Sequence, residues 1–164
     1  MRNFRIMIIV TGLAILAGSS GVAMAQDGAK PDEATALAVK LTTAGAELFD
    51  TFKPKAMANT YTEEAELVLT IRGGDGNIKV ERNVGRADIE KQYEKLFEKP
   101  QTIKSRNHVE YAKLIAPDIL VIAGTFDVNT LQSDAPKVPF YQVRVKEGDK
   151  WLISSMRIFV VLKP

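Results

Sequence analysis

The residues best able to transfer a proton are His108, which is the only histidine of the chain, and Asp127. An unperturbed imidazole titrates at about pH 6.5, so His108 could act as a general acid or base. Asp127 follows an apolar segment, and a carboxyl group in an apolar pocket has a raised pKa and could move protons. The alternatives are a solvent-facing histidine beside Arg106 and Glu110, and an aspartate at the end of a strand, next to the loop over 129–137. His108 and Asp127 are the candidate catalytic residues.

Tyrosine hydroxyls and one arginine are the groups best suited to bind a ligand. Each of Tyr61, Tyr93, Tyr111 and Tyr141 could place its hydroxyl in a pocket, or pack in the core with the hydroxyl bonded to backbone. Tyr93 shares a helical face with apolar residues and is expected to point inward. Arg157 lies among apolar neighbours in SSMRIFVV, where it could bind an anion or pair with a carboxylate across a dimer interface. The candidate ligand-binding residues are Tyr61, Tyr93 and Arg157.

The sequence offers little for a metal or a cofactor. It has no cysteine and one histidine, so a zinc site would depend on carboxylates. The loop 73–77, GGDGN, precedes a strand pattern and not the Lys-Ser/Thr and helix of a phosphate-binding loop. It also lacks the ligand spacing of a calcium-binding loop. We expect no metal, no cofactor and a plain hairpin turn at this loop.

The first 25 residues have the three regions of a secretory signal peptide. Arg2 and Arg5 are followed by an uncharged apolar run over 6–17 and by Ala23-Met24-Ala25, a small-residue cleavage pattern. The alternative is a membrane anchor, but a helix of this run is about 18 Å long, shorter than a hydrocarbon core of about 30 Å. We expect cleavage before Gln26 and a periplasmic or secreted protein.

The net charge and the length of the chain after such cleavage indicate its class of partner and its number of domains. The chain has 22 basic and 20 acidic residues, and removal of Arg2 and Arg5 would leave 20 of each. This balance does not favour a nucleic-acid partner, which needs a basic face, and we expect no membrane association after cleavage. Residues 26–164 have the length of a single domain, and the absence of cysteine excludes a disulfide framework.

The pattern along the chain predicts helices first and a long sheet afterwards. Apolar residues at helical spacing predict helices over 31–52 and from Gly85 to the residues before Pro100, with a short helical turn over 54–59. Strands are predicted over 64–72, 78–83, 102–115, 119–129, 138–146 and 150–162. The last four have short connections and should form an antiparallel meander. The strand that begins at Ile119 is apolar on both faces, which favours a homodimer.

Three segments of the chain carry a family resemblance: AMANTYTEEA (56–65), GRADIEKQYEKLF (85–97) and VRVKEGDKWLI (143–153). They resemble the SnoaL-like branch of the nuclear transport factor 2-like superfamily, and within it the SgcJ/EcaC-type secreted proteins. The resemblance implies an α+β, cystatin-like fold: a cone-shaped roll in which a strongly bent antiparallel sheet wraps around N-terminal helices. It also implies a pocket at the wide end and dimerisation through the outer face of the sheet.

The resemblance leaves function open, because this superfamily includes isomerases, dehydratases, cyclases and members without known activity. We expect an exported domain that binds a small organic ligand in a semi-apolar pocket. One alternative is a cofactor-free isomerase, dehydratase or hydrolase that uses a carboxylate or His108 with a tyrosine. Another is a protein-interaction module that uses the face of the sheet. The enzyme alternative requires His108, Asp127 or Arg157 to point into the cavity near a tyrosine hydroxyl.

Overall fold

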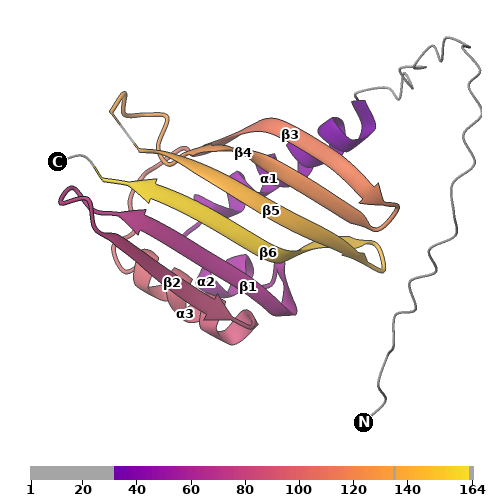
Figure 1. Cartoon of the computed structure of the whole chain (residues 1–164), viewed down its shortest axis with the longest axis horizontal. Coiled ribbons are helices and arrows are strands. Elements are labelled where there is room, and N and C mark those ends of the chain that lie inside the picture. The colour runs from indigo at the N-terminus through magenta and orange to yellow at the C-terminus, as the bar shows by residue number, and fades with distance from the viewer. Residues whose placement is uncertain (1–31, 135, 163–164) are drawn as a thin grey trace, which may run out of the picture.

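The computed structural model describes residues 32–134 and 136–162, and the expected signal peptide lies outside the described residues. Within this part of the chain the helices are α1 (Asp32–Phe49), α2 (Pro54–Ala58) and α3 (Arg86–Leu96) (Figure 1). The strands are β1 (Tyr61–Arg72), β2 (Ile78–Val84), β3 (Arg106–Ala116), β4 (Ile119–Asp127), β5 (Lys137–Glu147) and β6 (Lys150–Val161).

These six strands form one sheet in the order β2-β1-β6-β5-β4-β3. The meander from β3 to β6 is antiparallel, as predicted, and β1 and β2 form an antiparallel hairpin. The β1–β6 pair is parallel, so the prediction of an antiparallel sheet is wrong for that pair. After β2, the chain passes through α3 to the opposite edge of the sheet, where β3 lies. The strands β3 to β6 then return toward β1, each antiparallel to the one before it. The last of them, β6, lies beside β1 and runs in the same direction.

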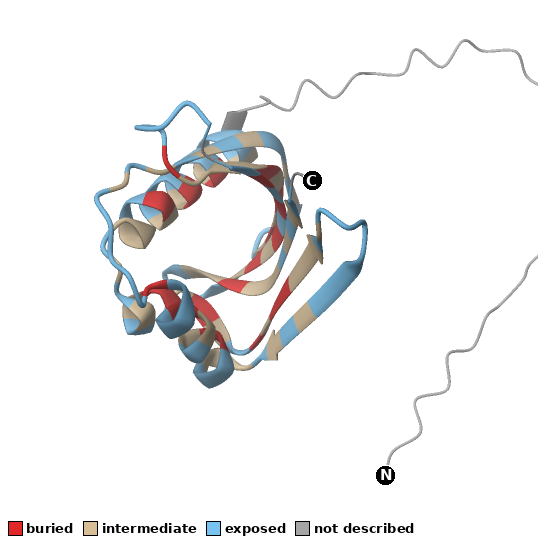
Figure 2. Ribbon diagram, turned by 90° about the vertical axis from the view of Figure 1, so that its left-hand side faces the viewer, coloured by how far each residue is buried: buried red, intermediate tan, exposed pale blue. Residues whose placement is uncertain are grey.

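The sheet bends strongly around the helices, with α1 over one half of its inner face and α2 and α3 over the other (Figure 2). The pairing register shifts at Glu110 of β3 and at Ser154 of β6, where each strand has one residue more than its partner. A β-bulge adds local twist and bends the strand that contains it. The predicted α+β cone with a strongly bent sheet is confirmed.

The core is divided between the two ends of the bent sheet. One buried cluster joins α2 and α3 to β1 and β6 and includes Tyr61, Leu67, Ile89 and Tyr93. The other joins α1 to β4 and β5 through Ala38, Leu120, Ile122 and Phe140. Met156 of β6 packs against both clusters from its partly buried position. The helices are thus anchored at the two ends and leave the middle of the inner face for a pocket.

Helix α1 ends at Phe49, three residues before the predicted end. Phe52 has a positive φ of 52°, which ends helical geometry before Pro54. The Asp50 carboxylate accepts hydrogen bonds from the Ser105 backbone N–H at 3.1 Å and from the Ser105 hydroxyl at 2.5 Å. These two hydrogen bonds hold the segment before β3 against the end of α1. Strand β3 begins at the next residue, Arg106. None of the described helices is long and apolar enough to cross a membrane.

Candidate ligand-binding pocket

A cavity of about 580 Å³ lies between the helices and the inner face of the sheet. Its walls are mainly apolar side chains from α1 and the strands: Leu37, Leu41, Leu48, Phe49, Phe126, Phe140, Trp151, Met156 and Ile158. Gly45 of α1 also lines the cavity, and a Cβ placed there would meet no atom within 4 Å. A volume of this size is typical of a pocket for a small organic molecule.

Two of the predicted ligand-binding residues meet in this cavity. Tyr61 begins β1 and Tyr93 lies on the apolar face of α3; both are buried and both line the cavity. Their hydroxyl oxygens are 2.9 Å apart and share a hydrogen bond. The Arg86 guanidinium at the start of α3 donates two hydrogen bonds to the Tyr61 carbonyl, from Nε at 3.1 Å and from Nη2 at 2.7 Å. These bonds fix α3 relative to β1 and so set the position of Tyr93 opposite Tyr61.

Both phenols stay protonated over the ordinary pH range. Burial raises the pKa of Tyr61 well above its usual value, and its interaction with Tyr93 raises it further. Burial also raises the pKa of Tyr93. Each phenol has a single proton, so one tyrosine donates to the other and the second O–H remains free. The pair therefore offers one hydroxyl donor to a molecule in the cavity.

A buried arginine, Arg144, lies in the same cavity. It lies on the inner face of β5, as do Val138, Phe140 and Gln142, which occupy every second position before it. Arg144 is 5% exposed. Its Nε donates to Gln142 Oε1 at 2.6 Å, and its Nη1 donates to the Trp151 carbonyl at 3.3 Å. Both acceptors are neutral. Among the described residues, no carboxylate lies within ion-pair distance of Arg144.

Burial changes the titration of Arg144 without removing its charge. Loss of solvation lowers the pKa of Arg144 to about 10, and Tyr61 and Tyr93 have a smaller effect in the opposite direction. In turn, the positive charge of Arg144 lowers the pKa of both tyrosines by less than burial raises it. Arg144 is therefore a cation at neutral pH, held close to the tyrosine pair inside an apolar cavity.

The remaining charged residues of the cavity lie at its rim. Lys40 of α1, Lys150 of β6 and Asp149 of the β5–β6 turn line it and are exposed. Together with Arg144, the lining has three basic residues and one acidic residue. In the described part of the chain, no group of three or more histidine and carboxylate side chains is arranged to hold a metal ion. The distinctive chemistry of the pocket is thus a set of hydrogen-bond donors beside a cation.

The candidate catalytic residues lie on the opposite, outer face of the sheet. His108 Nε2 is 2.9 Å from Asp127 Oδ2, across the β3–β4 pair. The His108 side chain is about half exposed, and Lys137 Nζ approaches Asp127 Oδ1 at 3.9 Å. Neither His108 nor Asp127 lines the cavity. The structure brings these two residues together but keeps them apart from the tyrosine pair.

Arg157 also lies on the outer face. It shares sequence parity with Trp151 and Ile153, which line the cavity, but Ser154 is an extra residue between paired positions of β6. This bulge reverses the parity, so Arg157 points outward. Its Nη2 is 3.3 Å from Glu66 Oε2 of the same chain. The structure therefore separates Arg157 from Tyr61 and Tyr93.

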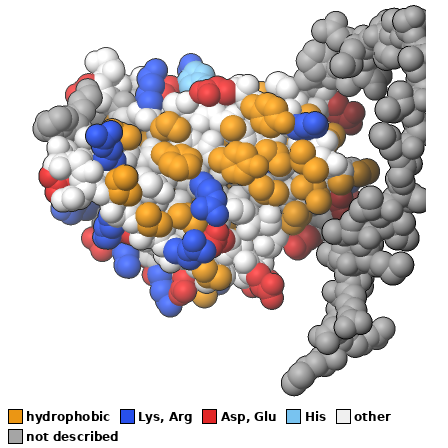
Figure 3. Space-filling view, viewed as in Figure 1, with side chains coloured by type: hydrophobic (Ala, Val, Ile, Leu, Met, Phe, Trp, Pro, Cys, Tyr) orange, Lys and Arg blue, Asp and Glu red, His pale blue; other side chains and the backbone are white. Residues whose placement is uncertain are grey.

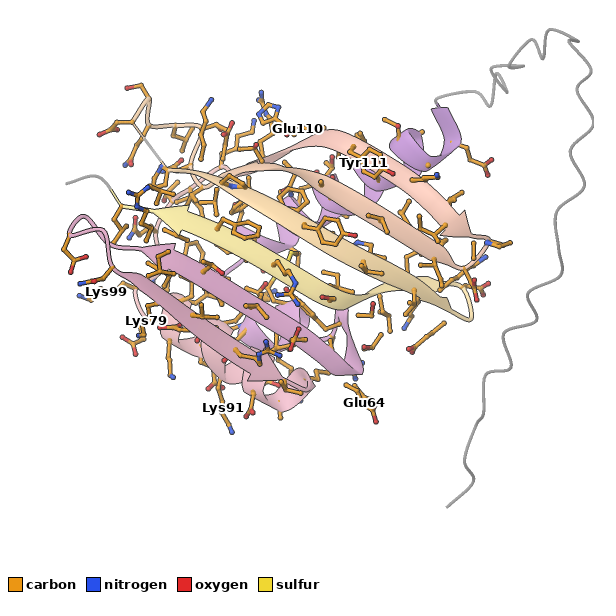
Figure 4. All side chains as sticks on the ribbon, in the orientation of Figure 1. Glu64, Lys79, Lys91, Lys99, Glu110 and Tyr111 are labelled. Carbon is orange, nitrogen blue, oxygen red and sulfur yellow. The ribbon has the colours of Figure 1, made fainter. Side chains whose placement is uncertain are left out.

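Tyr111 and Tyr141 are the other two tyrosines, and neither lines the cavity. Tyr111 is 50% exposed and Tyr141 is 39% exposed. Figure 4 shows Tyr111 beside Glu110 on β3, near the bulge of that strand. Both tyrosines thus contribute to the outer surface of the sheet.

Sequence reasoning missed Arg144 and Gln142 as pocket residues. The usable signal was the alternation in β5, because Arg144 shares parity with Val138 and Phe140. The opposite parity contains Tyr141, Val143 and Val145 and is also apolar. Alternation shows which residues share a face, but two apolar faces do not show which one lies inside.

Comparison with known proteins supports the fold. No family model and no curated protein matches the sequence. Among solved structures, the chain is similar to an NTF-2-like protein of unknown function from Shewanella oneidensis (17% identity, TM-score 0.60, covering 76% of this chain and 98% of that one). It is also similar to a domain of unknown function with a cystatin-like fold from Nostoc punctiforme (11%, 0.58, 79% and 78%). A third is a putative calcium/calmodulin-dependent protein kinase II association domain from Xanthomonas campestris (20%, 0.55, 80% and 90%). The chain therefore has the NTF2-like, cystatin-like fold.

Proposed function

We propose that this protein is a binding domain that holds one small organic molecule in the cavity between its helices and sheet. The observation that supports this most directly is the cavity of about 580 Å³, with apolar walls and a cluster of polar groups from Tyr61, Tyr93, Gln142 and Arg144. Apolar walls supply binding energy, and a few convergent polar groups orient the ligand. We further propose that the domain spans residues 26–164 and acts outside the cytoplasm after removal of the signal peptide.

The enzyme alternative is less well supported by the arrangement of titratable groups. A proton-transfer site needs a base within hydrogen-bond reach of the substrate. His108 and Asp127 lie on the outer face, and the one acidic residue of the described lining is Asp149 in an exposed turn. Tyr61 and Tyr93 have raised pKa values, so both phenols stay protonated and neither supplies a base at neutral pH.

A neutral fluorescent probe tests the binding function. N-phenyl-1-naphthylamine becomes bright in apolar pockets, and the purified domain should bind it with saturable fluorescence. Gly45→Leu would extend a side chain into open cavity space and should weaken this binding by about tenfold. Gly45→Ala is the matched control, because it adds a single carbon and leaves most of the cavity open.

Two results would contradict the binding function. One is a folded wild-type protein that binds neither the probe nor other small apolar molecules. The other is a folded Gly45→Leu variant that binds as tightly as the Gly45→Ala variant, which would place the probe elsewhere on the protein.

The outer face of the sheet supports an accompanying proposal of a homodimer, or of another protein bound at the same surface. Apolar side chains gather across this face (Figure 3), and Tyr141, Phe159 and Val161 are all exposed there. Large exposed apolar patches mark interaction sites in soluble proteins. The pocket lies on the inner side of the sheet, so ligand binding and association through the outer face would use different surfaces.

A further inference from the structure

The positive charge of Arg144 has no negative partner among the described residues. Its guanidinium is buried and charged at neutral pH, yet its two hydrogen-bond partners, Gln142 Oε1 and the Trp151 carbonyl, are neutral. A buried charge is costly unless an opposite charge pairs with it. By contrast, the exposed Arg157 and Arg82 both pair with Glu66. Arg144, the buried arginine of the described residues, has the greatest need for a counter-ion and has no carboxylate within ion-pair distance in that part of the chain.

The donors around Arg144 also outnumber the acceptors. A guanidinium has five N–H groups, and two of them have acceptors in the described part of the chain. The Tyr61–Tyr93 pair adds one free O–H group. A molecule that binds beside Arg144 and the tyrosine pair must therefore supply hydrogen-bond acceptors. A carboxylate has two oxygens that accept several hydrogen bonds and match the planar guanidinium.

Within the proposed binding function, we infer that the ligand is an amphipathic monocarboxylate. Its carboxylate lies against Arg144 and the tyrosine pair, and its apolar body lies along Leu41, Phe140 and the other hydrocarbon walls of the cavity. The exposed Lys40 and Lys150 at the rim, opposed by Asp149 alone, attract anions toward the opening.

The composition of the cavity selects this class over other anions. Arg144 is the one buried cation of the described lining, so a dianion such as phosphate would carry uncompensated charge into an apolar space. A neutral alcohol or amide could accept some of the hydrogen bonds but would leave Arg144 without a counter-charge. A short carboxylate such as acetate would balance the charge but leave the apolar walls uncovered.

Octanoate and 1-octanol have apolar chains of similar length but differ in charge, so a comparison of their affinities isolates the effect of the carboxylate. By isothermal titration calorimetry, the wild-type protein should bind octanoate at least about tenfold more tightly than 1-octanol. Arg144→Met should remove this preference and leave 1-octanol binding unchanged or improved. Arg157→Met is the matched control: it makes the same substitution on the outer face and should keep the preference for octanoate.

The outcomes distinguish this inference from the binding function. If 1-octanol binds the wild type as tightly as octanoate, or if Arg144→Met keeps the preference, the inference is wrong and the apolar pocket stands. If octanoate, 1-octanol and the neutral fluorescent probe all fail to bind, the binding function itself is wrong.

A measurement on the wild type keeps the test decisive if Arg144→Met does not fold. Octanoate labelled with carbon-13 at the carboxyl carbon reports its own titration by NMR. Contact with the Arg144 guanidinium should lower the pKa of bound octanoate below that of the free acid. A bound pKa equal to or above the free value would mean that Arg144 does not offset the desolvation of the carboxylate, and it would overturn the inference.

Discussion

At the scale of single residues, the position of each polar group on one or other face of the sheet decides its role. Tyr61, Tyr93 and Arg144 lie together in the cavity, whereas His108 and Asp127 form a hydrogen-bonded pair on the outer surface. The inner groups are desolvated, so their hydrogen bonds and charge interact strongly. The outer pair is partly exposed to water, which weakens its interaction.

The tyrosine pair allows a prediction about coupling. In Tyr93→Phe, the buried Tyr61 hydroxyl would lose its bond at 2.9 Å, and the free energy of unfolding should fall by about 1–3 kcal/mol. Tyr61→Phe should have a similar cost. The double variant should lose less than the two single losses together, because it leaves neither hydroxyl buried alone.

Urea unfolding of the four proteins in this double-mutant cycle checks the prediction. Strictly additive losses would mean that the two hydroxyls do not depend on each other. The change in the midpoint should be compared at constant slope, since a changed slope reports a different unfolded or native state.

At the scale of elements, the bulges and turns set the path of the sheet around the pocket. Gly124 of β4 lies opposite Val109, where the register of β3 shifts. A Cβ at Gly124 would lie 2.1 Å from the His108 carbonyl oxygen and 3.2 Å from the Phe140 ring. The two strands therefore approach so closely that only glycine fits at this position.

Two glycine-to-alanine changes should have opposite effects on stability. Gly124→Ala forces a backbone clash and should lower the free energy of unfolding by about 1–3 kcal/mol or more. Gly45→Ala adds a methyl group in open space inside α1 and should raise it by about 0.5–1 kcal/mol. Thermal and urea unfolding measure both, and equal effects of the two changes would contradict this account of Gly124.

At the scale of the whole molecule, the bent sheet separates the two surfaces for which different roles are proposed. Its inner face borders the cavity, and its outer face exposes apolar side chains around the Glu66–Arg157 and Glu66–Arg82 pairs. Because the described lining of the pocket comes from one chain, the proposed ligand binding should not depend on association. Changes on the outer face should therefore alter oligomeric state and leave the affinity for ligand unchanged.

The proposed homodimer leads to a prediction about Phe159. We expect light scattering coupled to gel filtration to show a dimer of the wild-type domain. Phe159→Lys would place a charge within the apolar patch and should shift the protein to monomer. Leu131→Lys is the control, because Leu131 is exposed and belongs to the loop between β4 and β5, outside the strands.

A wild-type protein that is monomeric at all accessible concentrations would contradict the homodimer. A Phe159→Lys variant that remains dimeric would place the interface on a different surface. Binding of the neutral fluorescent probe by both variants shows that the pocket is intact.

The sequence by itself determined the order and type of the elements and the class of the fold. Apolar periodicity, Pro54, the turn at Gly148 and the short connections of the meander are local signals, and local signals are present in the chain before it folds. The inward position of Tyr93 also followed from helical spacing, because an amphipathic helix has one apolar face.

Only the tertiary structure decided which arginine enters the pocket. The strands β5 and β6 have apolar residues on both faces, so alternation did not identify the inner face, and the extra residue at Ser154 reversed the parity of Arg157. The parallel β1–β6 pair and the meeting of Tyr61 with Tyr93 and Arg144 join segments far apart in sequence. Such contacts depend on how the sheet closes around the helices, and no local pattern encodes that closure.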